Sequence, residues 1–379
     1  MAVMDRRSFT ALVGATAAAA TVLPVSASSA APAGSPARGR GRGRGRRSLP
    51  TPYVVGHRGA SGYRPEHTLA SYTLAAHMGA DFIEPDLVIT KDGVLVCRHE
   101  PEISGTTDVS ERPDFAARRT TKTLDGVATT GWFVEDFTLA ELRTLRAVER
   151  LPKVRQENTI YDGLWQVPTF EEVLKLRKQL SLDLGREIGV YPETKHPTYF
   201  REIGLPLEER LVPLVQRYGL NNKNAAIRIQ SFELTNLLMM RSKMKVRAPL
   251  VFLTSGSGTP YADDRTYAEL LSPAGLRTYA DQIDGLGPDW SQVIARNSDG
   301  TLGAETDLVK NAHAAGLEVC PYTVRAENQF LPTDYRLGAD PNDYGRVMDL
   351  LHRLYDAGID GIFSDNPDVA VVARDTWRG

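Results

Sequence analysis

Short apolar runs typical of β-strands alternate with helical patterns along most of this chain, and no other feature limits its possible folds as strongly. Strand-like runs separated by helices predict a parallel sheet, because each helix returns the chain to the start of the next strand. Eight such runs favour a closed (β/α)8 barrel over an open sheet. The predicted strands span residues 53–57, 81–87, 187–193, 226–230, 249–253, 283–287, 317–323 and 359–364.

The chain is long enough for an insertion in this α/β fold, the TIM barrel. Residues 48–379 exceed the roughly 250 residues of a typical barrel, and the polar segment 100–168 does not fit the repeat. We therefore predict a capping insertion after the second strand, with a helical piece near residues 138–149. The turn at Lys91-Asp92-Gly93 is too short for a crossover, so residues 94–98 are predicted to form a hairpin arm on the second strand.

Residues 1–30 have the pattern of a Tat-type signal peptide. Arg6-Arg7-Ser8-Phe9 is a twin-arginine motif, an alanine-rich apolar run continues to about Val25, and small residues offer cleavage sites after Ala27 or Ala30. The alternative, a disordered alanine-rich leader, is less favoured. The pattern predicts export to a secreted, periplasmic or cell-wall-associated location, without a stable membrane span.

Residues 31–50 are predicted to be a disordered Gly/Arg-rich linker that precedes the barrel at residues 51–379. The alternating Gly and Arg of residues 38–47 suit either a flexible linker or binding of a polyanion, and we favour the linker. Beyond residue 47 the chain has 37 basic and 46 acidic residues, a net charge of −9. This balance gives no general support to nucleic-acid binding. An anionic substrate would require positive charge concentrated at its site.

The chain contains two cysteines, Cys97 and Cys320, which fall on or beside different predicted strands. Export would allow a disulfide between them. Two buried thiols are an equal alternative, because the sequence does not give the distance between the two residues.

Three carboxylates are predicted to meet at one end of the barrel. Glu84 and Asp86 are two residues apart on a strand, so both side chains point to the same face. Glu193 ends the next core strand and would converge on them. Acids packed together need a cation, and oxygen ligands suit Ca²⁺ or Mg²⁺ better than zinc. The adjoining Pro85 and Pro192 are expected where the ladder ends, at the barrel rim.

Two histidines, His57 and His99, follow strand-like runs on either side of this acidic pair in the sequence. Histidine titrates near neutral pH, so such a pair can supply the base and the acid that cleavage of a diester requires. A structural histidine is the alternative for either residue alone. His77, His196, His313 and His352 carry no such pattern, and we expect them to be surface or packing residues.

The order and spacing of these motifs resemble the glycerophosphodiester phosphodiesterase family, in particular its exported bacterial branch. The likeness covers nearly the whole chain after about residue 50. The residues that carry it are His57-Arg58-Gly59, Pro65-Glu66-His67-Thr68, Glu84 with Asp86, Thr90-Lys91-Asp92-Gly93, His99, Glu193-Thr194-Lys195, Gln230-Ser231-Phe232, Tyr322-Thr323-Val324 and Ser364-Asp365-Asn366-Pro367-Asp368.

The resemblance implies a role for most of these residues. It implies that the three acids hold one divalent cation, with Ca²⁺ favoured and Mg²⁺ as the alternative, and that the two histidines transfer protons, although the sequence does not fix which is the acid. Arg58 and Lys195 would hold the phosphoryl oxygens, and Tyr322, where relatives often have Trp, would lie over the substrate. Glu100 follows His99 where most members have Asp, which leaves the orientation of the histidine open.

Further residues receive weaker expectations from the same likeness. His67 has either a supporting or a structural role, and Asp365 is expected to brace the last turn of the barrel rather than take part in chemistry. The insertion at residues 100–168 would be a lid over the substrate, with smaller loops at 254–265 and 327–345 on the same rim. Gln230, Phe232 and Phe363 are candidates for the glycerol pocket, with barrel packing as the alternative.

The function implied is metal-dependent hydrolysis of small glycerophosphodiesters to sn-glycerol 3-phosphate and an alcohol. In the hypothesis for the mechanism, the 2-hydroxyl of the substrate attacks phosphorus, and water then opens the cyclic phosphate. A phospholipase D-like, lysophospholipid or teichoic-acid phosphodiesterase on the same barrel is the alternative, although no apolar patch for acyl chains is evident. A phosphodiester-binding protein without catalytic activity is a weaker alternative. The sequence leaves the oligomeric state open.

Overall fold

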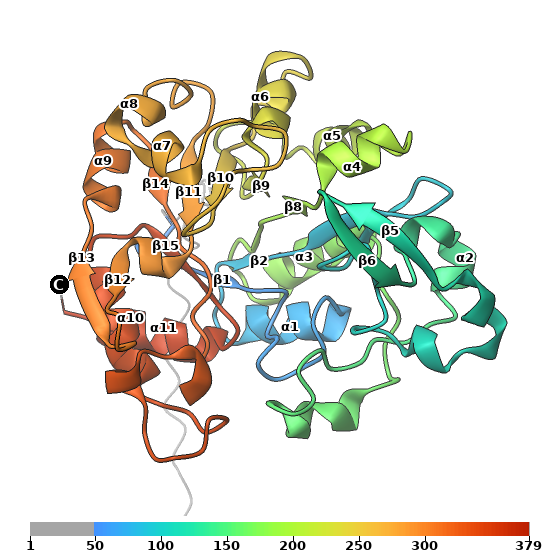
Figure 1. Cartoon of the computed structure of the whole chain (residues 1–379), viewed down its shortest axis with the longest axis horizontal. Coiled ribbons are helices and arrows are strands. Elements are labelled where there is room, and N and C mark those ends of the chain that lie inside the picture. The colour runs from blue at the N-terminus through green and yellow to red at the C-terminus, as the bar shows by residue number, and fades with distance from the viewer. Residues whose placement is uncertain (1–48, 379) are drawn as a thin grey trace, which may run out of the picture. The chain divides into compact units, whose positions relative to one another are not determined.

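A ring of eight parallel strands forms the centre of the structure, a computed structural model that describes residues 49–378 (Figure 1). Two of the eight strands are each interrupted once, so they carry two labels. The barrel strands are β1 (Tyr53–Gly56), β2 with β3 (Phe82–Ile83 and Asp86–Ile89), β7 with β8 (Gly189–Val190 and Glu193–Thr194), β9 (Ile229–Ser231), β10 (Leu250–Thr254), β11 (Gly285–Pro288), β14 (Glu318–Val319) and β15 (Gly361–Ser364).

The hydrogen-bonded neighbours of these strands show that the ring is closed. One ladder runs β15-β1-β2-β7 and the other runs β14-β11-β10-β9-β8-β3. They are joined on one side because β2 continues into β3 and β7 into β8. On the other side, Val324 beyond β14 forms a parallel bridge with Ser364 of β15, and the Phe363 amide donates to the Pro321 carbonyl at 3.0 Å. The predicted (β/α)8 barrel and its eight strands are therefore confirmed.

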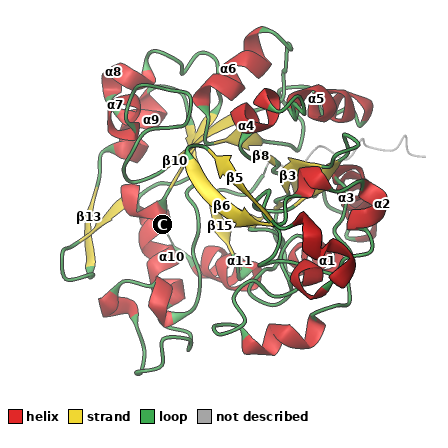
Figure 2. Ribbon diagram, turned by 45° about the vertical axis from the view of Figure 1, so that its right-hand side comes forward, coloured by secondary structure: helices red, strands yellow, loops and turns green. Residues whose placement is uncertain are grey.

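Helices surround the barrel, as Figure 2 shows with strands in the middle and helices around them. Their apolar faces and the outer faces of the strands form the main core, in which the apolar side chains are buried. The helices are α1 (Leu69–His77), α2 (Leu139–Leu142), α3 (Phe170–Asp183), α4 (Pro197–Glu202), α5 (Glu208–Arg217), α6 (Leu234–Ser242), α7 (Tyr267–Leu271), α8 (Pro273–Leu276), α9 (Leu308–Ala314), α10 (Val347–Asp356) and α11 (Pro367–Thr376).

A second, smaller apolar cluster lies apart from the helices and includes Val55, Phe82, Tyr191 and Phe363. Its aromatic rings meet edge to face, with centroids 5.7 Å apart for Phe82 and Tyr191 and 5.0 Å apart for Tyr191 and Phe363. Alternate residues of a strand share a face, so the residue two positions after each of these points the same way. Those next residues are His57, Glu84, Glu193 and Asp365.

The two prolines beside the acids interrupt the strands without ending them, contrary to the expectation that the ladder ends there. Beyond Pro85 and Pro192 the pairing continues, and Asp86 of β3 lies in register with Glu193 of β8. Each proline lacks an amide donor but keeps its carbonyl. The Pro85 carbonyl accepts from the Glu193 amide at 3.0 Å, and that of Pro192 accepts from the Gln230 amide at 2.9 Å. The strands therefore pass through the acidic cluster.

The predicted hairpin arm is confirmed as β4 (Leu95–Cys97), which pairs antiparallel with β3. The following segment contains a hairpin of β5 (Thr120–Leu124) and β6 (Val127–Gly131). The helix expected at residues 138–149 is wrong beyond its first turn, because α2 ends at Leu142. Further on, Ala147 bridges to Thr107 and its amide donates to the Trp165 carbonyl, so pairing with distant segments overrides local helix propensity. A small hairpin of β12 (Ile294–Arg296) and β13 (Leu302–Glu305) follows β11.

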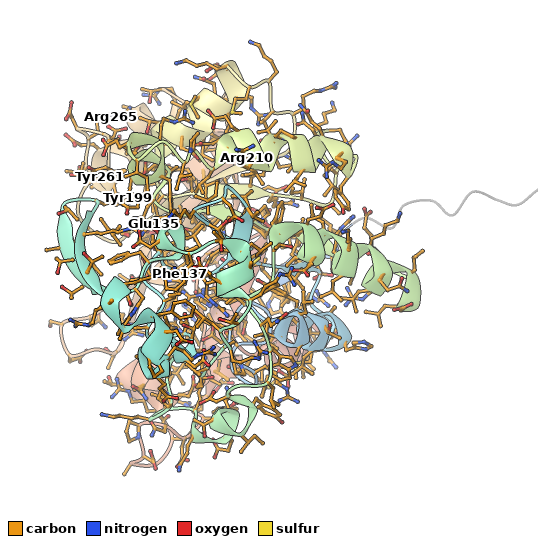
Figure 3. All side chains as sticks on the ribbon, turned by 90° about the vertical axis from the view of Figure 1, so that its right-hand side faces the viewer. Glu135, Phe137, Tyr199, Arg210, Tyr261 and Arg265 are labelled. Atoms are coloured by element: carbon orange, nitrogen blue, oxygen red, sulfur yellow. The ribbon has the colours of Figure 1, made fainter. Side chains whose placement is uncertain are left out.

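The β5–β6 hairpin is fastened to the barrel by buried polar contacts. Lys122 of β5 lies 2.8 Å from both Glu135 and Asp136. The Tyr199 hydroxyl of α4 donates to the Glu135 carboxylate at 2.5 Å, and Figure 3 labels both residues on the face that carries the hairpin. The insertion is therefore bound to a helix that follows β8, next to the acidic cluster.

Among the described residues, no helix has both the length and the apolar character that a membrane span requires. The predicted signal peptide at residues 1–30 and residues 31–48 of the predicted linker lie outside the described residues.

Both cysteines are buried free thiols, so the alternative without a disulfide is the one the structure contains. Burial raises the pKa of each thiol well above its ordinary value, which disfavours the reactive thiolate. We expect Ellman's reagent to detect no rapidly reacting thiol in the native protein and two per chain after denaturation without reductant. Detection of none after denaturation would contradict the free-thiol assignment.

Candidate active site

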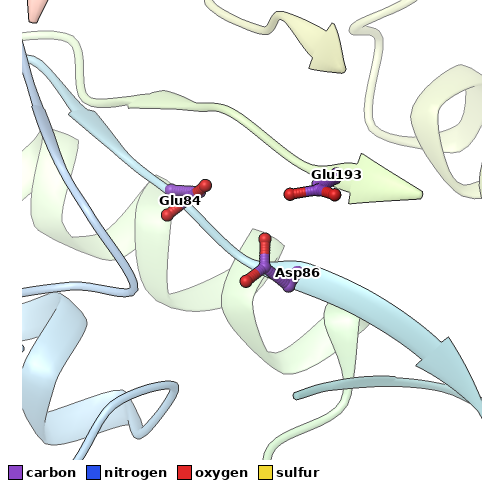
Figure 4. Close-up of side chains that lie close together, drawn as sticks. All are labelled: Glu84, Asp86 and Glu193. Carbon is purple, nitrogen blue, oxygen red and sulfur yellow. The ribbon is translucent and has the colours of Figure 1, made fainter. Parts of the chain in front are cut away.

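The three acids predicted as metal ligands meet at one place inside the barrel. Glu84 follows β2, Asp86 begins β3 and Glu193 begins β8, and each offers a carboxylate oxygen that lies within 4.8 Å of the other two. All three are at most 5% exposed. Figure 4 shows their carboxylates turned toward one another. The register between Asp86 and Glu193 and the two-residue spacing to Glu84 produce this convergence.

Neighbouring groups hold the Glu84 carboxylate in place from two sides. The Arg58 backbone amide donates to one of its oxygens at 2.8 Å, and the Gln230 side chain donates to the other at 2.9 Å. Gln230 was predicted as a candidate for the glycerol pocket. Its amide nitrogen instead fixes the orientation of an acid in the cluster.

The other two acids have one firm partner each. His67 Nε2 lies 2.9 Å from Asp86 Oδ2 and its Nδ1 lies 2.8 Å from the Tyr72 hydroxyl, so the supporting role is the one its contacts fit. Lys195 Nζ lies 3.0 Å from Glu193. The second oxygen of Asp86 is buried without any hydrogen-bond partner in the structure.

The electrostatics of this cluster fit a divalent cation. Burial and the neighbouring carboxylates raise the pKa of Glu84. Burial likewise raises the pKa of Asp86 to about 6 and that of Glu193 to about 8. The Glu66 carboxylate adds to the rise for Asp86, and the Asp86 carboxylate adds to the rise for Glu193. An oxygen without a partner and three acids that resist ionisation together are what a Ca²⁺ or Mg²⁺ ion would satisfy. The residues present therefore fit the predicted cofactor.

His57 lies beside this cluster and is held by an acid on its far side. Its Nδ1 is 2.5 Å from Asp365 Oδ1, and its Nε2 is 3.9 Å from Glu84 and 3.5 Å from the Thr323 hydroxyl. Burial, with a contribution from the Arg58 cation, lowers the pKa of His57 to about 3. The imidazole is therefore neutral at ordinary pH, with one nitrogen fixed by Asp365.

Asp365 was expected to brace the last barrel turn rather than take part in chemistry, and its contact with His57 adds a second role, that of holding this imidazole in place. Its other oxygen accepts from Arg155 at 2.6 Å and from Arg325 at 3.0 Å, and these two cations and His57 hold the pKa of Asp365 well below its usual range. Arg155, which no sequence pattern singled out, comes from the insertion and is also 2.6 Å from Glu327.

His99 lines the same cavity as His57 and is less enclosed, with its side chain 30% exposed against 8% for His57. Its Nδ1 is 2.8 Å from Glu100 and its Nε2 is 3.5 Å from Lys195 Nζ. Burial and the nearby Arg58 and Lys195 cations lower its pKa well below the ordinary value. Glu100, expected to stand where most family members have Asp, therefore holds the ring through Nδ1.

His196 was expected to be a surface or packing residue, and the structure corrects this. Its Nδ1 lies 2.6 Å from Asp125 in the β5–β6 turn, and its Nε2 lies 2.9 Å from Glu100. Burial acts against the charged form, but hydrogen bonds to Asp125 and Glu100 outweigh it and raise the pKa of His196 to about 9. Nothing in the local sequence indicated this, because its partners lie about 70 and 96 residues away.

The basic residues predicted to hold phosphate lie beside the acids, with Arg58 in the wall of the cavity that contains His57 and His99 and Lys195 in the wall of an adjoining cavity. Arg58 adopts a left-handed conformation with φ of 58°, which is costly outside glycine and is typical of functional sites. Its side chain pairs with Glu66 at 2.9 Å, and Lys195 pairs with Glu193. Both cations are therefore held in place by acids.

A cavity of about 110 Å³ brings most of the predicted site residues together. Tyr322 lies in its wall, with its hydroxyl donating to the Thr254 carbonyl at 3.0 Å and its ring against Phe232 at 5.7 Å between centroids. The lining residues are His57, Arg58, Glu84, His99, Glu193, Gln230, Phe232, Leu253, Tyr322, Thr323, Arg325 and Phe363.

A closed α/β barrel with acids and histidines at one cavity defines a class of hydrolases, and comparison with known proteins identifies the family. Residues 57–369 match the model of the glycerophosphoryl diester phosphodiesterase family. Glycerophosphodiester phosphodiesterase GDPD6 of Arabidopsis thaliana is 36% identical over 327 residues, 83% of each chain. The Bacillus subtilis glycerophosphodiester phosphodiesterase is 32% identical over 320 residues, 83% of this chain and 84% of its own. The chain belongs to this family and is an enzyme, a phosphoric diester hydrolase.

Solved structures of other proteins have the same fold as this chain. A glycerophosphoryl diester phosphodiesterase structure from Silicibacter pomeroyi has a TM-score of 0.60 at 22% identity and covers 88% of this chain and 95% of its own. A phosphodiesterase from Oleispira antarctica, solved in complex with the product sn-glycerol-3-phosphate, has a TM-score of 0.56 at 22% identity, with 86% and 98% covered. At this identity the likeness confirms the barrel fold.

The raised pKa values predict how metal and pH affect stability. Without metal, the folded chain keeps protons on Glu193 and Asp86 that the unfolded chain releases near pH 4 to 4.5, so its stability falls as pH rises toward about 8. A cation binds the ionised acids, so the increase in unfolding temperature on adding Ca²⁺ should be larger at pH 8 than at pH 5. Thermal unfolding with chelator and with Ca²⁺ measures both trends.

A matched variant separates the cluster from the other titrating groups. Glu193→Gln should reduce both the loss of stability with pH and the Ca²⁺ increment. Equal Ca²⁺ increments at both pH values, or in both proteins, would count against a cation at these acids.

Proposed function

We propose that this enzyme hydrolyses glycerophosphodiesters to sn-glycerol 3-phosphate and an alcohol, in a reaction that requires a divalent cation. The observation that carries the proposal is the convergence of Glu84, Asp86 and Glu193 beside a cavity whose wall contains two of these acids and both imidazoles, His57 and His99. The names of the relatives support the substrate class, and the product bound to the Oleispira antarctica phosphodiesterase supports the product.

Glu84, Asp86 and Glu193 would hold the cation, for which Ca²⁺ is favoured and Mg²⁺ is the alternative. Such an ion, when bound, neutralises developing charge on phosphoryl oxygens and lowers the pKa of a nearby hydroxyl. Arg58 and Lys195 lie at the rim of the same cluster, where they complete the positive surroundings of an anionic phosphodiester.

The two histidines would divide proton transfer according to their surroundings. His57 is neutral and its Nδ1 is bonded to Asp365, so Nε2 is free to remove the proton of the substrate 2-hydroxyl as that oxygen attacks phosphorus. The anionic phosphodiester would favour the imidazolium form of His99, which would then protonate the departing alkoxide through Nε2 and become neutral, with its Nδ1–H held by Glu100. Water then opens the cyclic phosphate, with the proton transfers reversed. Asp365 is a positioning residue that fixes the tautomer of His57.

Substitution of either histidine tests this assignment. We expect His57→Ala and His99→Ala each to lower kcat for glycerophosphocholine roughly 10²- to 10⁴-fold, the usual contribution of general acid–base catalysis. Release of sn-glycerol 3-phosphate can be followed with glycerol-3-phosphate dehydrogenase, with chelator and with Ca²⁺ added back. The exposed His77 at the end of α1 provides the control, and His77→Ala should retain wild-type turnover.

Near wild-type turnover of His57→Ala would overturn the role given to that residue. Binding of glycerophosphocholine without any release of product by the wild-type enzyme, with metal present, would favour the alternative of a phosphodiester-binding protein.

We also propose that the chain is exported through the Tat pathway to a secreted, periplasmic or cell-wall-associated location. The twin arginines Arg6 and Arg7 and the apolar run that follows support this. Replacing both arginines by lysine should retain the protein inside the producing cell, as measured by immunoblotting of cell fractions. Unchanged export of Arg6→Lys/Arg7→Lys would contradict this route.

A further inference from the structure

A second cavity, of about 290 Å³, adjoins the one that contains the acids and histidines. The two cavities share Glu193 and Phe232 in their walls. The remaining wall of the second cavity comes from the β5–β6 turn, the segment after β8, the start of α6 and the loop after β10. Residues from these segments include Asp125, His196, Glu233, Thr259, Tyr261 and Tyr267.

Glu233 is a buried carboxylate in this wall that has no cationic partner. It is 3% exposed, and it accepts hydrogen bonds from the Thr198 amide at 3.3 Å and from the Thr198 hydroxyl. No Lys, Arg or His among residues 49–378 forms an ion pair with it. Burial raises its pKa to about 7. A buried carboxylate is costly without a counter-charge, so this side of the cavity favours a positive ligand.

The cations already in the wall are each matched by acids. His196 is bonded to both Asp125 and Glu100, and Lys195 is bonded to Glu193. His196 also attracts Glu233 through space, but two other acids already match its charge, so Glu233 has no cationic partner of its own among the described residues. The excess negative charge of the second cavity is therefore located at Glu233.

Aromatic rings supply the rest of the recognition surface. Phe232 stands between the two cavities, and Tyr261 and Tyr267 belong to the loop and helix that follow β10. Tyr261 is 38% exposed at the outer edge, on the face seen in Figure 3. Ring faces attract ammonium groups and especially quaternary ones. The first cavity differs, since Arg58 and Arg325 in its wall favour an anion.

We propose that the second cavity binds the leaving alcohol and selects alcohols that carry an ammonium group. The inference rests on the proposed function, because it needs the phosphoryl group of a glycerophosphodiester in the first cavity. A zwitterionic diester then places its phosphate against the basic wall and its ammonium group between Glu233 and the aromatic rings. Neutral head groups of the same size lose the second interaction.

An uncharged isostere provides the sharpest test. We compare kcat/KM for sn-glycero-3-phosphocholine with that for the 3,3-dimethylbutyl ester, in which carbon replaces the ammonium nitrogen. The wild-type enzyme should prefer the choline ester by about tenfold or more, and Glu233→Gln should reduce this ratio to near one. Glu111→Gln removes an exposed charge of the 3-10 helix Asp108–Glu111 that does not line the cavity, and it should keep the wild-type ratio.

A second variant covers the case in which Glu233→Gln does not fold. Tyr261→Ala changes an exposed loop residue and should lower the same ratio, whereas Tyr261→Phe should preserve it. Equal kcat/KM for both esters in the wild-type enzyme, or an unchanged ratio in Glu233→Gln, would overturn the inference while leaving the proposed hydrolysis intact.

Failure of the proposed function has a different signature. Hydrolysis of neither ester with Ca²⁺ present would count against that function. Calorimetry with free choline and free 3,3-dimethylbutanol then tests the cavity alone. Binding of choline in preference to the alcohol supports the cavity assignment, and equal or absent binding overturns it.

Discussion

Mutual repulsion among the carboxylates of Glu84, Asp86 and Glu193 is the constraint on which the rest of the structure depends. Two unit charges within 4.8 Å repel by roughly 3–4 kcal/mol at the effective dielectric constant of a protein near 20. A single hydrogen bond contributes only about 1 kcal/mol, so those from Gln230 and the Arg58 amide orient the acids without neutralising them. Neighbouring cations compensate in part, and an ion between the acids would complete the balance.

The barrel can hold such a cluster because alternation along a strand separates apolar from polar side chains. Phe82 and Tyr191 pack edge to face within the smaller apolar cluster, and the acids come two residues later on the same strands. The strands therefore place the smaller apolar cluster directly beside the cluster of three acids.

Local patterns explain which parts of this arrangement could be predicted from the sequence. The strands, the hairpin arm and the face shared by Glu84 and Asp86 follow from spacings of a few residues. The partners of Asp365 and His196 lie far away in sequence, with 308 residues between Asp365 and His57, so no local pattern reveals them. The same alternation applies to Asp365, which comes two residues after the buried Phe363. This spacing could have indicated that the Asp365 side chain points to the same face as Phe363. The helix predicted at residues 138–149 ends early because Ala147 pairs with Thr107 and Trp165. Local helix propensity does not include such distant pairing.

Arg155 connects the insertion to the reaction centre, since one guanidinium contacts Asp365, Glu327 and the Ser61 carbonyl. The insertion is thus connected to the His57 imidazole through Asp365. Exchange of the insertion between relatives, by recombination or by design, therefore also exchanges the residue that contacts Asp365 and Glu327. A graft that omits this one guanidinium leaves Arg325 as the remaining arginine paired with Asp365 among residues 49–378, and it therefore changes the surroundings of His57 together with the cover of the cavity.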